Sequence, residues 1–508
     1  NRQGSMSNID SAALAERLFH AYDIRIDAGL LDYDHARRLF DAIAVYARTV
    51  LKVDSVLLCR DARLSGNSLL QQGIEHFSCL GFSVHTELNP VSTCQFYFSC
   101  SRLGSILGIM IGASHNPGRY TGQKLVGPYC IPIAQDIGPA GGLTQIRQLF
   151  IQGAALDLAS KRGDILCIED RTAYVQACLS WAGVEKGSLH GLRVVLDFLS
   201  GTAAAEVLLG LQEAGVHFVA RNVVPDGNFP SGPPNPILEQ SIKPTVAYLK
   251  EHPSYDFCFC FDGDGDRVDT IAHGLVNVEP SLVLAFLAPG FKRFHPDSAS
   301  TAFGFDPKAN PLLVNSIKAY GAKPQLIPNG HSKIKELLVK RNAQGMVAAV
   351  EESAHYYITL AYEGRIVATE STLLIILLFL KTWREEKQRF LDLLDLQNSV
   401  ERKREWGYTY ANDSNRAKAL SRVEKAFLSQ GFESVNTQAD GTLLGSSLLR
   451  IGAAGESPVW ACISQRSSES EEGVARWSVV ASDAGLLAQC VDTIDTIAAQ
   501  DAIVSYQG

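Results

Sequence analysis

The serine at position 114 stands where a side chain could do chemistry, at the end of an apolar run. Residues 108–111 read GIMI and are followed by GASHNP, so a predicted strand ends in small residues and is stopped by a proline. His115 lies beside the serine, and Lys124 follows ten residues later. The GxSxG turn of many serine hydrolases is absent. By themselves these residues fit either a reactive serine or a Ser/Asn-capped turn.

A second segment, FDGDGDR, places Asp262, Asp264 and Asp266 at alternate positions. Side chains two residues apart in an extended segment point the same way, so the carboxylates converge. They would repel one another without a cation, and such hard oxygen ligands suit Mg²⁺ or Ca²⁺. An EF-hand is excluded because Arg267 and His273 stand where its glycine and glutamate are needed. The segment predicts a divalent-metal site with positions open to a phosphoryl oxygen; the alternative is a solvated acidic turn.

A third segment, VEESAH at residues 350–355, follows a strand-like run. Glu351, Ser353 and His355 offer a carboxylate, a hydroxyl and an imidazole at short spacing, and these groups can hydrogen-bond adjacent sugar hydroxyls. A helix N-terminal turn, where the dipole favours acidic residues, explains the segment equally well.

A fourth segment, SQRSSESEE at residues 464–472, sets one guanidinium beside several hydroxyls. Together with free backbone amides, such a set can cradle a phosphate. The three glutamates suit a polar surface loop as well, and taken alone the segment slightly favours that loop.

The elements that must position these segments alternate between strand-like and helix-like patterns. Apolar runs at residues 56–59, 192–197 and 301–305 each lead through a turn into a helical pattern. This alternation predicts parallel, doubly wound sheets with ligand sites at the carboxyl ends of strands. The last hundred residues or so mix short strands with helices and predict a smaller α+β domain.

Length and composition restrict the class of protein. A chain of 508 residues predicts several domains, because single cores stop growing at about 250–300 residues. The net charge of −8 gives no basic footprint for nucleic acid. The longest apolar run, residues 373–380, is shorter than the roughly 20 residues of a membrane span, so we expect a buried helix and no membrane association.

Cysteine usage predicts a reducing compartment. The 11 cysteines are scattered and include no CxxC pair, and no signal-peptide pattern is visible, so we expect a cytoplasmic protein. Cys258 and Cys260 lie in FCFCF, which predicts buried strand residues in preference to metal ligands.

The four segments together resemble the motifs of the α-D-phosphohexomutases, the phosphomannomutase/phosphoglucomutase family, and occur in that family's order. The family motifs are TASHNP for the phosphoserine, DGDGDR for the metal, GExSGH for the sugar and RxSxTEP for the phosphate. Shorter matches extend the resemblance over residues 19–476; they are AYDIR at 21–25, RDARLSG at 60–66, PDGNFP at 225–230, GHS at 330–332 and DG at 440–441.

The resemblance implies an α/β protein in which three similar doubly wound domains and a smaller α+β C-terminal domain surround a central cleft. The implied domains are 6–168 with the phosphoserine loop, 169–278 with the metal loop, 279–395 with the sugar-binding loop and 396–508 with the phosphate-binding loop.

Carried over residue by residue, the resemblance implies a role for each motif. Ser114 would carry the transferable phosphate and would bind one Mg²⁺ together with Asp262, Asp264 and Asp266. The reacting end would be lined by Arg25, His115, Lys124 and Arg267. Lys124 would be a candidate general acid/base, and His355 would assist proton transfer. Sugar hydroxyls would be held by Glu351 and Ser353, and the non-reacting phosphate by Arg466, Ser468 and Ser470.

The implied reaction moves a phosphoryl group reversibly between the 1- and 6-positions of glucose or mannose phosphate. It would pass through a phosphoserine enzyme and a hexose 1,6-bisphosphate, which also serves as primer. The expected partner is the hexose phosphate, and the enzyme would be a monomer or homodimer. Two alternatives stay open: an amino-sugar phosphate mutase, and a weakly active or inactive sugar-phosphate-binding protein.

The sequence departs from the family pattern at several positions. Val350 and Ala354 stand where glycine is usual in the sugar loop, and Glu472 stands for proline in the phosphate loop. Pro328 and Asn329 precede GHS where the family often has a substrate-facing lysine. Gly112 replaces threonine, and Ser470 replaces a threonine but keeps its hydroxyl. The departures at the sugar end leave the preferred hexose open.

Overall fold

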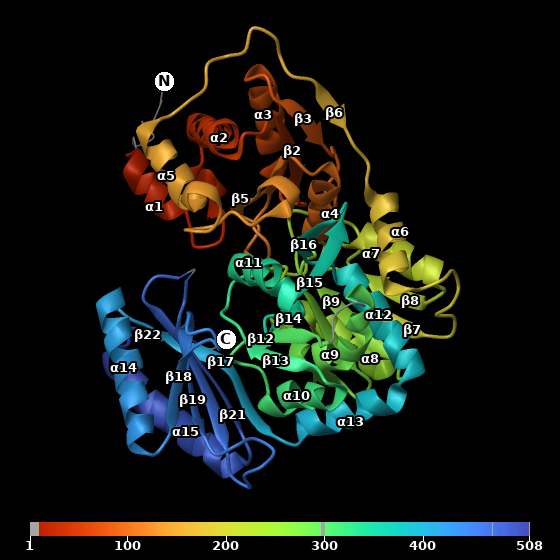
Figure 1. The fold of residues 1–508 in the computed structure, drawn as a ribbon, viewed down its shortest axis with the longest axis vertical. Coiled ribbons are helices and arrows are strands. Elements are labelled where there is room, and N and C mark those ends of the chain that lie inside the picture. The colour runs from red at the N-terminus through yellow and green to blue at the C-terminus, as the bar shows by residue number, and fades with distance from the viewer. Residues whose placement is uncertain (1–9, 296–299, 470, 507–508) are drawn as a thin grey trace. The chain divides into compact units, whose positions relative to one another are not determined.

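The computed structural model describes residues 10–295, 300–469 and 471–506. The chain forms two compact units, which are described separately. Unit 1 comprises the chain up to Val276 together with Leu360–Leu377, and unit 2 comprises Asn277–Thr359 and the chain from Leu378 onward. Figure 1 labels the elements.

Unit 1 contains two sheets with helices. The first has the order β1-β5-β4-β2-β3-β6, in which β4, β2, β3 and β6 run parallel, β5 pairs antiparallel with β4, and β1 pairs antiparallel with β5. Its strands are β1 (Ile24–Asp27), β2 (Ser55–Arg60), β3 (Ser83–Thr86), β4 (Leu107–Ile111), β5 (Tyr120–Val126) and β6 (Ile165–Cys167). The helices of this region are α1 (Ser11–Leu18), α2 (Tyr33–Tyr46), α3 (Gly66–Cys79), α4 (Thr93–Leu103) and α5 (Leu143–Gln152).

The second sheet has the order β11-β10-β9-β7-β8, with β7, β8 and β9 parallel and β10 antiparallel to β9. Its strands are β7 (Arg193–Asp197), β8 (His217–Arg221), β9 (Phe257–Phe261), β10 (Val268–Ala272) and β11 (Val276–Val278). The accompanying helices are α6 (Arg171–Ala182), α7 (Ala204–Ala214) and α8 (Glu239–Glu251). Cys258 and Cys260 are fully buried in β9, as the FCFCF pattern predicted.

The third sheet has the order β13-β12-β14-β15-β16, with β12, β13 and β14 parallel and β15 antiparallel to β14. Its strands are β12 (Ala302–Phe305), β13 (Lys323–Leu326), β14 (Met346–Glu351), β15 (His355–Tyr362) and β16 (Arg365–Thr369). The helices are α9 (Pro280–Leu287), α10 (Pro311–Ser316), α11 (His331–Arg341), α12 (Thr372–Glu385) and α13 (Lys387–Asn398).

The fourth sheet, in unit 2, is antiparallel throughout and has the order β18-β19-β20-β21-β17-β22. Its strands are β17 (Glu401–Thr409), β18 (Glu433–Thr437), β19 (Leu443–Ile451), β20 (Ala461–Ser467), β21 (Val474–Ala481) and β22 (Val504–Tyr506). The helices α14 (Asp413–Ser429) and α15 (Ala484–Ala498) pack on it around a core that includes Trp477 and Val423. The expected class, α/β domains followed by an α+β domain, is therefore confirmed.

The first three sheets share one plan, which positions the functional segments. Each contains the same four-strand series: β5-β4-β2-β3, then β10-β9-β7-β8, then β15-β14-β12-β13. In each series the second strand named (β4, β9 or β14) turns back into the strand named before it (β5, β10 or β15), with which it pairs antiparallel. The serine, metal and sugar segments all occupy this one turn, at the carboxyl end of a buried strand.

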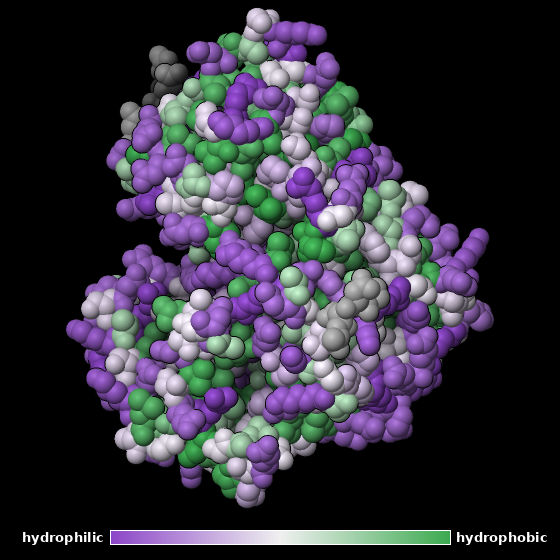
Figure 2. Space-filling model, in the orientation of Figure 1, coloured by the Kyte–Doolittle hydropathy of each residue, from purple (hydrophilic) through white to green (hydrophobic). Residues whose placement is uncertain are grey.

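Apolar burial follows the expected patterns. The run at residues 373–380 is buried within α12, as predicted. Among the described residues, no helix has both the length and the apolar composition to cross a membrane. On the face drawn in Figure 2, apolar residues are dispersed among polar ones, which is ordinary for a protein surface.

Candidate active site

The serine loop is the turn between β4 and β5. The amide of Gly112 donates to the carbonyl of Gly122 at 3.0 Å, so pairing continues just past the strand before the chain turns away. Ser114 then adopts a left-handed backbone with φ of 48°. Its side chain is nearly buried, with 6% of the residue exposed. A non-glycine residue held in this conformation marks a loop whose shape is fixed by its surroundings.

The metal loop is the equivalent turn between β9 and β10. Asp262, Asp264 and Asp266 are all buried, and one carboxylate oxygen of each lies within 4.8 Å of the others. The convergence expected from their alternate spacing is therefore present. Gly263 allows the loop to approach the serine, because a Cβ there would lie 2.6 Å from the carbonyl oxygen of Ser114.

Direct contacts join the two loops. The Ser114 hydroxyl donates to Asp262 Oδ2 at 3.1 Å. The Lys124 ammonium donates to Asp266 Oδ2 at 2.9 Å and to Asp264 Oδ2 at 3.4 Å. Ser114, Lys124 and the three aspartates are called the serine–metal group below.

The charges in the serine–metal group shift its pKa values strongly. Burial raises the pKa of Asp262 well above its usual value, and the charges of Asp264 and Asp266 raise it further, against the opposing effect of Arg267. Burial would lower the pKa of Lys124, but the surrounding acidic groups, Asp266 foremost, hold it well above its usual value. Lys124 is therefore an ammonium here, able to give a proton rather than accept one.

The donor set of the serine–metal group fits a hard divalent cation. Three buried carboxylates lie close together, and Asp264 Oδ1 is buried without a hydrogen-bond partner among the described residues. Burying a carboxylate oxygen without a hydrogen-bond partner costs free energy unless a cation lies next to it. Oxygen ligands of this kind suit Mg²⁺, and three of them leave coordination positions for further oxygens.

The other residues predicted for the reacting end lie around the serine loop. His115 Nδ1 is 3.4 Å from Ser114 Oγ. Arg25 on β1 donates to Asn116 Oδ1 at 2.6 Å, and the Arg267 amide donates to Asp262 Oδ1 at 3.2 Å. A small hollow in unit 1 is lined by Asp23, Arg25, Met110, Gly112, Ser114, Lys124 and Asp264.

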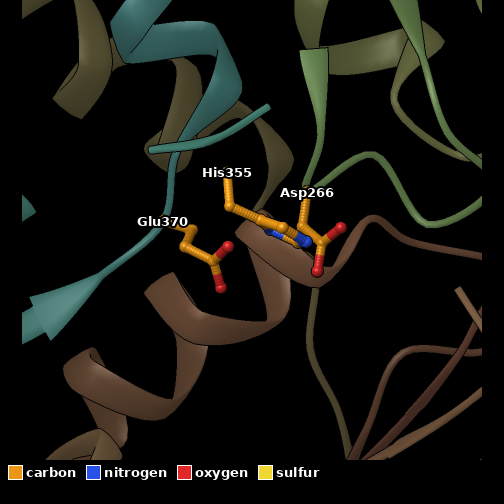
Figure 3. A group of neighbouring side chains, drawn as sticks. All are labelled: Asp266, His355 and Glu370. Atoms are coloured by element: carbon orange, nitrogen blue, oxygen red, sulfur yellow. The ribbon is translucent and has the colours of Figure 1, made fainter. Parts of the chain in front are cut away.

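Two further residues beside the triad were not predicted from sequence patterns. Glu370, after β16, is 1% exposed, and one of its carboxylate oxygens lies within 4.8 Å of one of Asp266. Figure 3 draws both carboxylates; the His355 in that view belongs to unit 2 and is described with it. Thr93, the first residue of α4, donates its hydroxyl to Asp264 Oδ2 at 2.5 Å. Neither residue stands in a recognisable motif, so only the fold brings them to the triad.

In unit 2 the sugar segment is the turn from β14 to β15. Glu351 ends β14, Ser353 lies half-buried in the turn, and His355 begins β15. Ala354 has φ of 71°, a conformation that favours glycine, which is the usual family residue here. The loop therefore keeps a glycine-like backbone although the residue has changed to alanine.

Glu351 is already held by donors of unit 2. Its carboxylate accepts from the Tyr357 hydroxyl, from Asn329 Nδ2 at 3.1 Å and from the amide of Gly330 at 3.0 Å. Burial would raise the pKa of Glu351, but His355 and these donors bring it below its usual value. Asn329, which stands near the family's usual lysine position, thus positions a carboxylate of the sugar segment.

The phosphate segment differs from its expected local structure. Residues 464–467 were expected in a loop, but β20 extends through Ser467, because Ser464 and Arg466 pair with Ser478 and Arg476 of β21. Cross-strand pairing thus overrides the polar, loop-like composition. Ser468 follows the strand and is buried, and its amide donates to Val474. Ser470 lies outside the described residues.

Arg466 is held by Glu405 of β17, which the sequence did not single out. Arg466 Nε and Nη2 donate to the two oxygens of Glu405 at 3.0 and 2.9 Å. Arg476 lies 3.2 Å and Lys308 3.5 Å from the same carboxylate. Burial would raise the pKa of Glu405, but these three cations lower it below its usual value. Glu351, Glu405, Arg466 and Lys308 are called the sugar–phosphate group below.

Comparisons with known proteins identify the family of the chain. The family profile for phosphoglucomutase/phosphomannomutase α/β/α domain I matches residues 16–139, and that for domain II matches residues 172–273. The protein named phosphohexose mutases from Xanthomonas campestris pv. campestris is 33% identical over 351 residues, or 67% of this chain and 72% of that protein. The phosphomannomutase of Salmonella typhimurium is 31% identical over 346 residues, with the same shares covered.

A solved structure of a phosphoglucomutase/phosphomannomutase family protein from Burkholderia thailandensis shares the fold. It aligns with a TM-score of 0.77 over 96% of this chain and 98% of its own, at 22% identity. The fold is that of a multidomain α/β protein, and its buried aspartate triad fits a divalent metal ion. The chain belongs to the phosphoglucomutase/phosphomannomutase family. It is accordingly a phosphohexomutase, an enzyme of the isomerase class.

Proposed function

We propose that the enzyme moves a phosphoryl group between the 1- and 6-positions of glucose or mannose phosphate by way of a phosphate on Ser114. The observation that carries the proposal is the hydrogen bond of 3.1 Å from the Ser114 hydroxyl to Asp262, within a buried aspartate triad. A phosphate at this serine would bring oxygens to the donor set that already contains three carboxylates.

The proposed reaction consists of two transfers. In the first, the phosphorus–oxygen bond to Ser114 breaks, a new one forms to a free hydroxyl of the hexose phosphate, and the proton of that hydroxyl ends on the serine oxygen. The product of this step is the hexose 1,6-bisphosphate. In the second transfer the other phosphate of the bisphosphate returns to Ser114. The same bisphosphate would prime an unphosphorylated enzyme.

Residues of the chain have distinct parts in these steps. Lys124, an ammonium in this structure, can protonate the leaving serine oxygen, and His115 and Arg25 lie at the same loop. Glu351 and Ser353 would bind the sugar, His355 would assist proton transfer, and Arg466, Ser468 and Ser470 would bind the phosphate that does not react. When bound, Mg²⁺ supplies positive charge beside the transferring phosphoryl group.

The test is the chemical state and activity of Ser114. We expect mass spectrometry to find a phosphoryl group on the Ser114 peptide after incubation with glucose 1,6-bisphosphate, and Ser114→Ala to have no measurable turnover of glucose 1-phosphate or mannose 1-phosphate. Ser78→Ala is the matched control, because that buried hydroxyl donates to the carbonyl of Gly163 at 2.7 Å and belongs to none of the functional segments. Full activity of Ser114→Ala contradicts the proposal. If the enzyme turned over glucosamine 1-phosphate and neither of the other two substrates, its substrate would be an amino-sugar phosphate instead.

A further inference from the structure

Arg63 lies against the serine loop and has none of the roles assigned above. It follows β2, and only 1% of its side chain is exposed, so it cannot reach a sugar or a phosphate from solvent. A buried guanidinium must find partners for its charge and its five donors, because burying an unsatisfied charge is costly. For Arg63 most of these partners are backbone carbonyls.

The guanidinium of Arg63 donates along the whole serine loop. Nη2 donates to the carbonyl of Ser114 at 3.0 Å and to that of Asn116 at 2.7 Å, and Nη1 donates to Pro117 at 2.7 Å. Two longer contacts of 3.2 Å reach the carbonyls of Ala113 and Tyr120. Because the guanidinium is a rigid planar fork, these contacts fix the shape of the loop.

Asp61 ties Arg63 to the residue before Ser114. Its Oδ1 accepts from the amide of Arg63 at 3.0 Å, and its Oδ2 accepts from Arg63 Nε at 3.1 Å and from the amide of Ala113 at 3.3 Å. A Cβ at Gly112 would lie 2.7 Å from the carboxyl carbon of Asp61. The glycine therefore leaves the space that the carboxylate occupies.

Ser114 needs support of this kind. Its φ of 48° is unfavourable for a residue with a side chain, so neighbouring contacts must offset the strain. The ring of Phe229 covers the guanidinium of Arg63 from the loop after β8, at 5.3 Å. Arg63 thus contacts the serine loop and a segment of the second domain predicted from the sequence.

The aspartate recurs at the equivalent place in the other two α/β sheets. Asp306 after β12 accepts from the amide of Lys308 at 2.7 Å and from that of Glu352, in the sugar turn, at 2.9 Å. Asp197 at the end of β7 also accepts from the amide two residues on, at 2.9 Å. Its other oxygen, however, accepts from the hydroxyl of Thr245 in α8 at 2.6 Å. Asp197 Oδ1 also accepts from Asn222 Nδ2 at 2.9 Å. Within the described part of the chain, the Asp197 carboxylate therefore has the same local turn but bonds Asn222 and Thr245 where Asp61 and Asp306 bond a functional loop, which makes it a suitable control.

We propose that Asp61 and Arg63 are positioning residues that hold Ser114 in line for phosphoryl transfer. Neither touches the reacting atoms; they act through the backbone of the serine loop. This inference rests on the phosphoserine of the proposed function. It identifies the residues that orient the side-chain oxygen of Ser114. The equivalent Asp306 gives the sugar turn the same kind of support.

The experiment compares Arg63→Lys and Asp61→Asn with Asp197→Asn in the full-length enzyme. With glucose 1-phosphate and glucose 1,6-bisphosphate, we expect Arg63→Lys to lower kcat about 100-fold and to leave KM within about threefold, because a displacement of about 1 Å costs that much in rate. Rapid-quench measurement should show an equally slow first phosphorylation of Ser114. Asp197→Asn should lower the melting temperature while the folded protein keeps its kcat.

Each outcome decides the matter. A folded Arg63→Lys enzyme with the kcat of the native enzyme overturns the positioning role, as do equal losses of kcat in Asp61→Asn and Asp197→Asn. Where Arg63→Lys does not fold, the comparison of the two aspartate variants decides alone. The native enzyme is tested for phosphorylation first: no phosphate on Ser114 overturns the proposed function, whereas phosphorylation at the native rate in the Arg63 and Asp61 variants overturns only this inference.

Discussion

In the serine–metal group of unit 1, carboxylates lie beside one another, whereas in the sugar–phosphate group of unit 2 they lie beside cations and N–H donors. Asp262, Asp264 and Asp266 share one small volume, and the pKa of Asp262 is raised by burial and by its neighbours. Glu351 and Glu405 are also buried to a large extent, yet hydrogen bonds and cations bring their pKa values below the usual range.

This difference shows which part of the site depends on a ligand for its stability. Glu351 and Glu405 of the sugar–phosphate group already have hydrogen-bond donors and cations from the chain itself. In the serine–metal group Lys124 pairs with Asp264 and Asp266, and Arg267 Nε lies 3.9 Å from Asp262. Burial and the two neighbouring carboxylates nevertheless hold the pKa of Asp262 well above its usual value. A divalent cation is the natural complement, so unit 1 should respond to metal and unit 2 should not.

The largest expected effect tests the metal dependence of unit 1. Asp264→Asn removes one charged ligand and should lower kcat on the order of 10³-fold, because charge stabilisation is the main contribution to phosphoryl transfer. Calorimetry should also show that Mg²⁺ raises the melting temperature of the native protein but hardly that of the variant. Asp256→Asn, just before β9 and outside the triad, is the control and should keep the metal response. An unchanged response in Asp264→Asn would break the comparison.

An intermediate effect is expected at Arg466 in unit 2. Arg466→Met should raise KM for glucose 1-phosphate about 10- to 100-fold, the loss expected for one charge-assisted contact of about 1.4–2.8 kcal/mol. The rate at which a small phosphoryl donor such as acetyl phosphate phosphorylates Ser114 should not change, because the serine–metal group is left intact. Arg450→Met, an exposed arginine on the neighbouring β19, should leave KM unaltered. Steady-state kinetics of the two variants decide between two explanations. A raised KM in Arg466→Met alone indicates a lost phosphate contact, whereas a raised KM in both indicates a general loss of surface charge.

The smallest effect concerns the pH dependence of stability, and it has opposite signs for Glu87 of unit 1 and Glu405 of unit 2. Burial raises the pKa of Glu87 in unit 1 to about 7, so its contribution to stability falls as the pH rises from about 4.5 to about 7. Glu87→Gln should therefore be more stable than the native protein at pH 8, by at most about 3 kcal/mol, and not at pH 5.

Glu405 in unit 2 has a lowered pKa, so its contribution is present above about pH 4.5 and is lost as the pH falls further. Glu405→Gln should lower the melting temperature at pH 7 and do so less below pH 4.5. Melting curves of both variants at several pH values check the two signs. If the change in melting temperature varied with pH in the same direction for both variants, the electrostatic contrast between Glu87 and Glu405 would be refuted.

Local patterns predicted the parts of the site that depend on a few adjacent residues. The alternate aspartates converge as expected, and Cys258 and Cys260 are buried strand residues. The alternation of apolar runs and helical patterns also led to the correct fold class. These features follow from spacing along the chain, which sequence displays directly.

Long-range contacts were beyond such patterns. Glu405 lies 61 residues from Arg466 in the sequence, and only the pairing of β17 with β21 and of β20 with β21 brings them together. The loop expected around Arg466 was wrong for the same reason, because the polar residues of β20 pair with β21 across the sheet. Likewise, the three functional turns could be found one by one, but their equivalence in three sheets depends on strand order. The four domain boundaries and the individual catalytic roles stay predictions.

Gly112 has a consequence for anyone who exchanges segments between relatives. Its place next to the Asp61 carboxylate leaves no room for a Cβ, although threonine is usual at this position in the family. The serine loop and the turn after β2 therefore form a matched pair in this chain. A chimera that takes only one of the two segments from another family member would place a side chain against the Asp61 carboxylate or remove its partner. Both segments should therefore be exchanged together.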